Sequence, residues 1–214
     1  MNVLSIAVGT PREVTWNDDL VLTSIFKTAV SGRVWVGPTN IAGDEQSDLT
    51  VHGGPEKAVY AYPSEHYAAW QRELGLESLP WASFGENLTT SGLRESVVRI
   101  GDRYRVGTAR FTVTQPRMPC FKLGIRFGRP DMIARFTSVD RSGFYLGVER
   151  EGEIGAGDRI ELVEQDERDL TVAEVYRLKL GGGTADRMAL AADHPALARG
   201  WREHFRRRLE ALGA

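Results

Sequence analysis

Residues 103–123 read RYRVGTARFTVTQPRMPCFKL and join a strand pattern to a cysteine. Two runs with β-branched and aromatic residues, Arg103–Val106 and Arg110–Gln115, lie on either side of Gly107-Thr108. Such runs favour β-strands, and a short glycine-containing link between them favours a tight turn. The stretch therefore predicts a β-hairpin that leads directly into a proline-bracketed loop.

Short strand-like segments of the same kind recur along the chain up to about residue 165. They are rich in valine, isoleucine, threonine and aromatic residues, and glycine and proline cut them apart. The further predicted strands are Leu4–Val8, Leu20–Phe26, Arg33–Val36, Ala58–Tyr62, Ser96–Ile100, Phe144–Arg150 and Asp158–Glu164, with Gly101-Asp102 as a second hairpin turn. Many short strands at this spacing predict a mainly β fold with some α, built as a closed or nearly closed barrel.

Two helices are expected to interrupt the strands. Ser64 is a suitable N-cap for a helix that runs to about Leu74, and Gly75 is a suitable stop. Pro130 favours the start of a second helix over Asp131–Thr137.

The pattern becomes helical after about residue 165. Thr171–Leu180 has helical spacing and ends at a run of three glycines, Thr184 caps a second short helix, and Pro195 starts a third that runs towards Leu212. The sequence therefore predicts two parts, a β-barrel over residues 1–165 and a three-helix extension over residues 166–214.

The composition restricts the class of protein. Of the 214 residues, 42% are hydrophobic and 26% are charged, as in an ordinary globular protein. The net charge of −2 predicts no global attraction to nucleic acid or to an anionic membrane. A single cysteine excludes an intramolecular disulfide and fits a reducing cytosol. The N-terminus lacks the basic and apolar segments of a signal peptide, so we expect a cytoplasmic protein.

The single cysteine, Cys120, lies in an unusual local context. Pro116 and Pro119 restrict the backbone on its N-terminal side, so the loop should be stiff. Arg117 and Lys122 place positive charge near the sulfur and favour the thiolate, the form that attacks electrophiles and binds soft metals. A small buried hydrophobe is the other common role of a free cysteine. The local residues leave both interpretations open.

Three further segments could bind a ligand. His52, Gly53 and Gly54 combine a hydrogen-bonding ring with glycines that let a ligand approach the backbone, although a β-turn with a satisfied histidine explains them equally. Asn87 follows Phe-Gly-Glu and could read a polar heterocycle, or could simply lie in a loop.

Thr23, Ser24 and Lys27 form the third segment. Two hydroxyls and a lysine could hold a phosphate, or the lysine could be a solvated strand residue. The arginines at positions 199, 202 and 206–208 are interpreted as a solvated helix face, with docking of a partner as the lesser alternative.

These segments, taken in order, resemble a known family. The order is Gly-Asp near residue 43, Asp-x-x-x-His-Gly-Gly, Phe-Gly-Glu-Asn, Gly-Asp-Arg and finally Gln-Pro-Arg-x-Pro-Cys. It resembles the MOSC domain, named for the C-terminal domain of molybdenum cofactor sulfurase, and in particular the stand-alone bacterial YiiM-type subgroup. The helical tail is similar to the three-helix extension often appended in that subgroup.

The resemblance implies a mixed β-barrel that binds the pyranopterin molybdenum cofactor. By position it implies Cys120 as the catalytic sulfur ligand of molybdenum, Thr23, Ser24 and Lys27 at the cofactor phosphate, His52, Gly53 and Gly54 along the pterin, and Asn87 and Arg117 beside it. A soft thiolate is a suitable ligand for such a metal.

The implied activity is reduction of N-hydroxylated compounds, such as N-hydroxylaminopurine-type base analogues, to amines. The sequence carries no flavin or iron–sulfur signature, so we expect the electrons to come from a separate reductase, and pyridoxal phosphate is not expected. A small-molecule substrate is expected, and no nucleic acid or membrane partner. The alternative is a carrier of sulfur or of the cofactor that uses a persulfide on Cys120.

Overall fold

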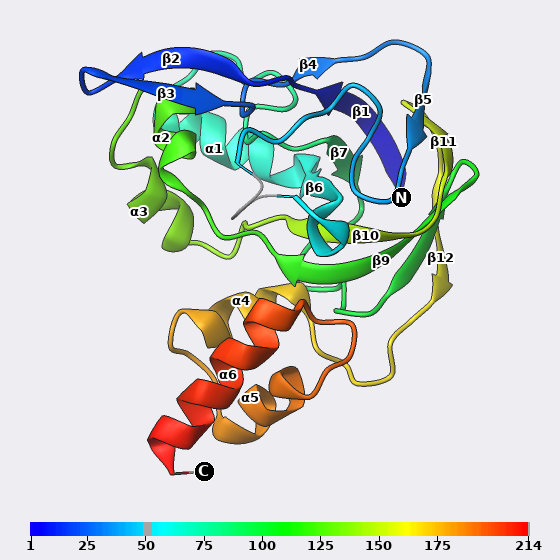
Figure 1. The fold of residues 1–214 in the computed structure, drawn as a ribbon, viewed down its shortest axis with the longest axis vertical. Helices are drawn as coiled ribbons and strands as arrows, with labels where there is room; N and C mark the ends of the chain where they lie inside the picture. The colour runs from blue at the N-terminus through cyan, green and yellow to red at the C-terminus, as the bar shows by residue number, and fades with distance from the viewer. Residues whose placement is uncertain (49–52, 214) are drawn as a thin grey trace.

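A mixed eight-stranded sheet forms the larger part of the structure (Figure 1). The computed structural model describes residues 1–48 and 53–213. The order of strands in the sheet is β12 (Ile160–Glu164), β8 (Arg103–Val106), β9 (Ala109–Pro116), β10 (Phe144–Arg150), β6 (Val59–Pro63), β7 (Leu88–Ser91), β1 (Asn2–Val8) and β4 (Thr28–Ala29). Two further pairs join β5 (Arg33–Val36) to β11 (Gly152–Gly155) and β2 (Arg12–Trp16) to β3 (Asp19–Thr23).

Backbone hydrogen bonds close this sheet into a barrel. The N–H of Val3 in β1 donates to the carbonyl of Asp158 at 2.9 Å, and the N–H of Ile160 donates to the carbonyl of Met1 at 2.9 Å. The segment that enters β12 therefore pairs with β1, near the opposite end of the strand order. Strands β6 and β7 are parallel, and the other pairs are antiparallel. The predicted fold class, a β-rich barrel with C-terminal helices, is confirmed.

The hairpin predicted from residues 103–123 is present. Val106 of β8 pairs with Ala109 of β9, so Gly107-Thr108 forms the turn. A Cβ atom on Gly107 would lie 2.2 Å from the carbonyl oxygen of Glu153, and Gly107 has a φ of 53°. Only glycine fits at this close approach with a left-handed backbone.

One predicted strand, Ser96–Ile100, is wrong. The N–H of Val98 donates to the carbonyl of Arg94, which makes a turn, and the N–H of Ile100 donates to Leu170, just before the helical part. Gly101-Asp102 is therefore not a hairpin turn. The β-branched residues of this segment fill a packed turn between the barrel and the helices, a tertiary role that resembles a strand in composition.

The helices also differ in detail from the prediction. The helical elements are η1 (Pro55–Lys57), η2 (Ser64–His66), α1 (Tyr67–Leu74), α2 (Phe121–Phe127), α3 (Met132–Thr137), α4 (Val172–Lys179), α5 (Ala185–Ala192) and α6 (Arg199–Leu212). Ser64 does not cap α1, because a 3₁₀ turn precedes the helix and the Ser64 hydroxyl makes no capping bond. Helix α6 begins at Arg199, four residues after Pro195.

Helix α2 and strands β2, β4, β7 and β11 were not predicted. Helix α2 contains Gly124 and Ile125, which have weak helix propensity, yet both are buried. A Cβ atom on Gly124 would lie 2.9 Å from the carbonyl oxygen of Arg129, so close packing selects glycine there. Tertiary contacts therefore form this helix against its local preference.

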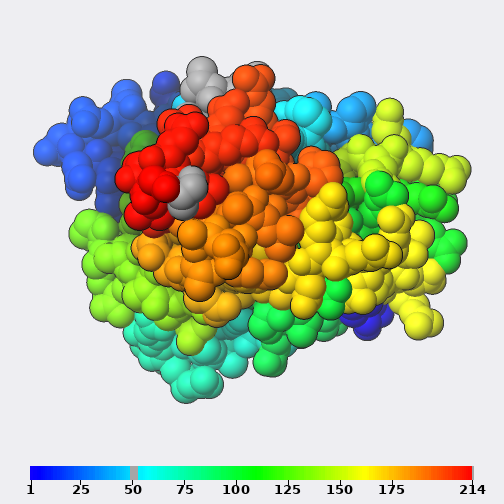
Figure 2. Space-filling model, turned by 90° about the horizontal axis from the view of Figure 1, so that it is seen from below, coloured from blue at the N-terminus to red at the C-terminus, as the bar shows by residue number. Residues whose placement is uncertain are grey.

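Helices α4, α5 and α6 pack against one end of the barrel (Figures 1 and 2). One hydrophobic cluster runs through both parts, from Phe111 and Val113 in β9 to Val175 in α4 and Phe205 in α6. The Ala198 N–H donates to the carbonyl of Thr114 at 3.1 Å, which fixes the start of α6 to β9. The division near residue 165 stays a prediction. Among the described residues, no helix is long and apolar enough to cross a membrane.

Phe205→Ala tests this shared core. Phe205 is fully buried, so truncation should lower the free energy of unfolding by about 3–5 kcal/mol. Leu212→Ala on the same helix is the control, because Leu212 is 64% exposed and should change stability by less than about 0.5 kcal/mol. Urea denaturation followed by circular dichroism measures both. Equal stability of the two variants would contradict the shared core.

Candidate functional site

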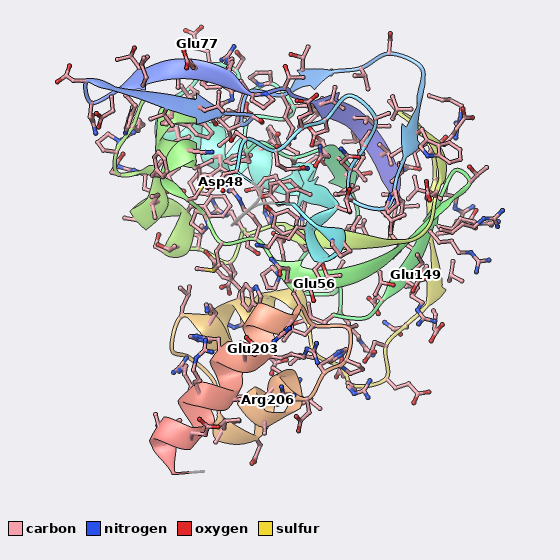
Figure 3. The ribbon with its side chains drawn as sticks, in the orientation of Figure 1. Asp48, Glu56, Glu77, Glu149, Glu203 and Arg206 are labelled. Atoms are coloured by element: carbon pink, nitrogen blue, oxygen red, sulfur yellow. The ribbon has the colours of Figure 1, made fainter. Side chains whose placement is uncertain are left out.

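A pocket in the barrel gathers segments that are far apart in the sequence. Its walls come from Thr23–Lys27 after β3, the loop Asp44–Ser47, the Phe84–Asn87 segment before β7 and the Arg117–Lys122 segment around Cys120. Gly53, Lys57, Tyr60 of β6 and Tyr145 of β10 complete the lining. Asp48, which follows the loop Asp44–Ser47, is labelled in Figure 3. The pocket holds about 680 Å³ of empty space, which includes open solvent at its mouth.

The structure brings most of the predicted site residues together. Those that line the pocket are Thr23, Ser24, Lys27, Gly53, Asn87, Arg117 and Cys120. Gly54 follows Gly53 but is not part of the lining, and His52 lies outside the described residues. The sequence therefore predicted which segments meet, while the role of each residue stays a prediction.

Cys120 lies at the pocket wall immediately before α2. It is a free cysteine, half-buried, with an extended φ of −119°, and its carbonyl accepts the N–H of Leu123 at 2.9 Å as the helix begins. Within residues 1–48 and 53–213, no group of three or more histidine, cysteine or acidic side chains could hold a metal ion. Among the described residues of the lining, Cys120 is the one thiol.

Arg117 is buried at the pocket with no acidic partner within the described ranges. Its guanidinium carbon lies 5.2 Å from the ring centre of Tyr60 and 5.1 Å from that of Phe136. The Nη1 atom is buried and has no hydrogen-bond partner among the described residues. A buried cation without a counter-charge is costly, so this group favours an anionic or oxygen-rich ligand.

Lys27 and Asp44 form a buried ion pair in the opposite wall. The Lys27 ammonium donates to Oδ1 of Asp44, which also accepts the N–H of Gly9 at 2.8 Å. Burial lowers the pKa of Lys27, and the Asp44 carboxylate opposes that shift. The pair therefore fixes the position of a cation at the pocket, as a phosphate site requires.

The two neighbouring hydroxyls of this wall differ. Oγ1 of Thr23 accepts the N–H of Ile25 at 3.2 Å, so it has a structural partner. Oγ of Ser24 is buried and has no partner among the described residues. Predicted strand Leu20–Phe26 ends at Thr23, and this early end leaves Ser24 and Lys27 free of the sheet.

Asn87 lines the pocket but uses its side chain within the barrel. Its Oδ1 accepts the N–H of Tyr60 at 3.1 Å, and its Nδ2 donates to the carbonyl of Ala7 at 3.2 Å. The amide therefore ties β6 to β1 beside the pocket. One role of Asn87 is therefore structural: its side chain holds the wall of the pocket together.

Several residues of the site had no predicted role. Glu86 is fully buried and accepts the N–H of Phe84 at 3.0 Å and the hydroxyl of Thr89 at 3.0 Å, so it shapes the loop before β7. Burial raises the pKa of Glu86, although these hydrogen bonds oppose the shift. Asp44 and Glu86 lie in the Gly-Asp and Gly-Glu-Asn motifs, and membership of these motifs is the sequence signal that could have identified them.

The lining as a whole is positive. Lys27, Lys57, Arg117 and Lys122 face two carboxylates, Asp44 and Glu45. Burial lowers the pKa of Lys57. Lys122 is nearly buried and its Nζ donates to Oγ of Ser47 at 2.6 Å. Tyr60 and Tyr145 add phenols whose pKa values burial raises, so both stay neutral. The arrangement suits an anionic ligand with polar edges.

Comparison with known proteins agrees with this architecture. The family model of the MOSC domain matches residues 48–161, and that of the YiiM-like 3-alpha helix domain matches residues 182–212. The chain therefore belongs to the MOSC domain family and carries a YiiM-like C-terminal extension. MOSC domains are associated with binding of the molybdenum cofactor.

Individual relatives cover different shares of the chain. YflK of Bacillus subtilis (strain 168), an uncharacterized protein, is 36% identical over 99% of this chain and 96% of its own length. The crystal structure of YiiM from Geobacillus stearothermophilus is 38% identical, with a TM-score of 0.82 over 97% of this chain and 98% of that one. A protein named "Reductase" from Gibberella moniliformis (strain M3125 / FGSC 7600) is 35% identical over 74% of this chain but only 28% of its own length.

Asp44→Asn tests the buried ion pair. The asparagine can still accept the Gly9 N–H, but Lys27 loses its counter-charge, so the free energy of unfolding should fall by about 3–5 kcal/mol. Glu45→Gln is the control, because Glu45 is the exposed neighbour and should change stability by less than about 0.5 kcal/mol. Chemical denaturation at neutral pH measures both. If Asp44→Asn left the free energy of unfolding unchanged, the ion pair would not be needed to stabilise the pocket.

Proposed function

We propose that this protein is a molybdenum-cofactor-dependent oxidoreductase that reduces N-hydroxylated compounds, such as N-hydroxylaminopurine-type bases, to amines in the cytoplasm. The observation that carries the proposal is the pocket that places one free thiol, Cys120, together with two buried polar groups that lack partners among the described residues, Ser24 Oγ and Arg117 Nη1.

The residues of the pocket fit the cofactor. A pyranopterin dithiolene supplies its own sulfur ligands to the metal, so the protein needs to add few ligands, and one thiolate is a suitable soft donor. The described residues offer no cluster of three ligating side chains, which agrees with a metal that arrives already coordinated. The cationic lining and the unpaired hydroxyl of Ser24 match a terminal phosphate.

Each part of the pocket then has a proposed task. Lys27 and Ser24 hold the phosphate, and Thr23 keeps their segment in shape through its bond to Ile25. Gly53 lines the pterin together with His52 and Gly54, and Arg117 donates hydrogen bonds beside it from its aromatic enclosure. Cys120 is the protein's ligand to the metal.

The bound cofactor supplies the two-electron chemistry, and the protein supplies binding, orientation and a restricted environment. The net reaction is R–NHOH with two electrons and two protons, giving R–NH₂ and water. The neutral phenols of Tyr60 and Tyr145 can orient a polar heterocycle at the pocket. The similarity of the chain to part of a protein named "Reductase" supports a redox role and the need for an electron donor.

Cys120→Ser is the direct test. The protein is purified from a molybdenum-replete host, its molybdenum and pterin are measured, and turnover of an N-hydroxylated base is assayed with reduced methyl viologen. We expect the parent to carry cofactor and turn over, and the variant to lose at least about tenfold of both because oxygen is a poorer ligand for a soft site. Circular dichroism of the variant controls for folding.

The outcomes separate the alternatives. A Cys120→Ser protein that keeps stoichiometric molybdenum would overturn the ligand assignment. A parent that carries cofactor without turnover favours the carrier of cofactor or of sulfur over the enzyme.

Ser24→Ala gives an independent test, because it should raise the stability of the cofactor-free protein and lower its retention of cofactor. In cofactor-free protein, removal of a buried hydroxyl without a partner should raise the free energy of unfolding by up to about 1 kcal/mol. In the same variant, cofactor retention should fall by about tenfold, because one hydrogen bond to the phosphate is lost. Thermal unfolding and metal analysis measure the two effects.

Thr23→Val is the matched control, because the Thr23 hydroxyl already accepts the N–H of Ile25. This variant should lose stability with or without cofactor. A Ser24→Ala protein that behaves in the same way would argue against a phosphate at this wall.

A further inference from the structure

A second positive surface lies outside the pocket, on the helical part. Lys179 at the end of α4 meets His204, Arg207 and Arg208 of α6, and we call these four residues the basic face. Positions 204, 207 and 208 are three and four residues apart, so they share one side of the helix. The Lys179 Nζ lies 5.4 Å from the ring centre of Trp201. Burial and then the charges of Arg207 and Arg208 lower the pKa of Lys179.

The basic face makes no direct ion pair among the described residues, although Arg207 lies near the Glu203 carboxylate and lowers its pKa, whereas two other arginines of α6 have acidic partners. Arg199 pairs with Glu203 at 2.6 Å and Arg206 pairs with Asp193 at 3.4 Å. Within residues 1–48 and 53–213, the members of the basic face make no ion pair, and Arg208 donates only to the carbonyl of Leu178, at 2.7 Å.

His204 shows the same lack of partners. Its Nε2 atom is buried and has no hydrogen-bond partner in the described part of the chain. Partial burial and then Lys179, Arg208 and Arg207 lower its pKa. Like charges held together reduce stability. The basic face therefore carries a cost within the isolated chain that an acidic partner would remove.

Exposed leucines border the basic face. Leu180, next to Lys179, is 47% exposed, and Leu212, four residues after Arg208, is 64% exposed. Arginine beside apolar side chains is typical of protein interfaces. A nucleic acid is less suitable, because the net charge of the chain is −2 and the basic face is small.

The basic face is connected to the pocket by α6. The N–H of Arg199, at the start of the helix, donates to Oε1 of Glu56 at 2.8 Å, and Lys57, which follows Glu56, lines the pocket. Figure 3 shows Glu56 where the barrel meets α6, with Glu203 and Arg206 farther along that helix. At 1.5 Å per residue, Arg207 and Arg208 lie about 12–14 Å along the axis from Arg199.

We propose that the basic face docks the acidic surface of a flavoprotein that donates electrons to the pocket. This proposal rests on the proposed function, which needs an electron donor on a separate chain. The overall step balances: the reduced flavin releases two electrons and two protons, and R–NHOH takes them up to give R–NH₂ and water. The cations of the basic face give the docking its orientation and its rate.

The test uses the full-length, cofactor-loaded protein and two donors. Reduced flavodoxin, an acidic flavoprotein, is the docking probe, and reduced methyl viologen is a small donor that needs no docking surface. Lys179→Gln/Arg207→Gln should lower kcat/KM for flavodoxin at least tenfold at low ionic strength and leave the viologen rate unchanged. The cofactor-free variant should also melt at a higher temperature than the parent, because repulsion is relieved.

Arg103→Gln/Arg105→Gln is the matched control. It removes the same charge from β8, where both arginines are exposed and paired with glutamates. This control should keep the flavodoxin rate and should not gain stability. Equal flavodoxin rates in the two double variants would overturn the proposal, as would binding of a DNA duplex in place of flavodoxin.

Failure of the proposed reductase function can be distinguished from failure of the docking proposal. If the parent shows no turnover with methyl viologen, the reductase proposal fails, and calorimetry with flavodoxin then decides the docking surface. Binding to the parent that weakens at least tenfold in Lys179→Gln/Arg207→Gln supports the basic face, and no binding to the parent overturns it.

Discussion

The hydrogen bonds of one buried segment, Glu86-Asn87, hold the pocket in shape. Asn87 joins β6 to β1 through its side chain, and its own N–H donates to the carbonyl of Tyr60 at 2.8 Å. Glu86 fixes the loop just before it through Phe84 and Thr89. These bonds lie where the parallel pair β6–β7 meets the antiparallel strand β1, so they tie the strand that carries Tyr60 to its neighbours beside the pocket. A half-satisfied polar network at this place would disturb both the barrel and the site.

The pocket departs from the usual rule that buried polar groups have partners. Arg117 and Ser24 each keep an unpaired polar atom within the described residues, whereas the nearby Lys27 and Thr23 are paired. The unpaired atoms of Ser24 and Arg117 remain available to a ligand, whereas the Thr23 hydroxyl is used within the wall and Asp44 holds the Lys27 ammonium in place at the pocket. Functional sites often lower the stability of a protein, as these unpaired polar atoms should do here.

The same contrast appears on the helical part. Arg199 and Arg206 of α6 form ion pairs, while Arg207 and Arg208 form none among the described residues, although all four are close in sequence. The helical part also shares its hydrophobic core with the barrel, so a protein that docks on α6 contacts an element fixed to the pocket wall. The three helices thus have a structural role and a surface suited to a partner.

Local sequence was enough to predict the strand-rich fold, the hairpin at Gly107-Thr108 and the helical C-terminal part, because turn chemistry and periodicity are local properties. The segments of the pocket were predicted from the order of motifs along the whole chain, which resembles that of the MOSC domain. The pairing of polar groups depends on contacts between segments that the local sequence does not reveal. Asp44 meets Lys27 and Glu86 meets Tyr67 only in the folded barrel, which also buries Ser24 Oγ and Arg117 Nη1 without a partner among the described residues. Helix α2 and the turn at Ser96–Ile100 were likewise decided by packing, which can override the weak local preferences that a sequence reveals.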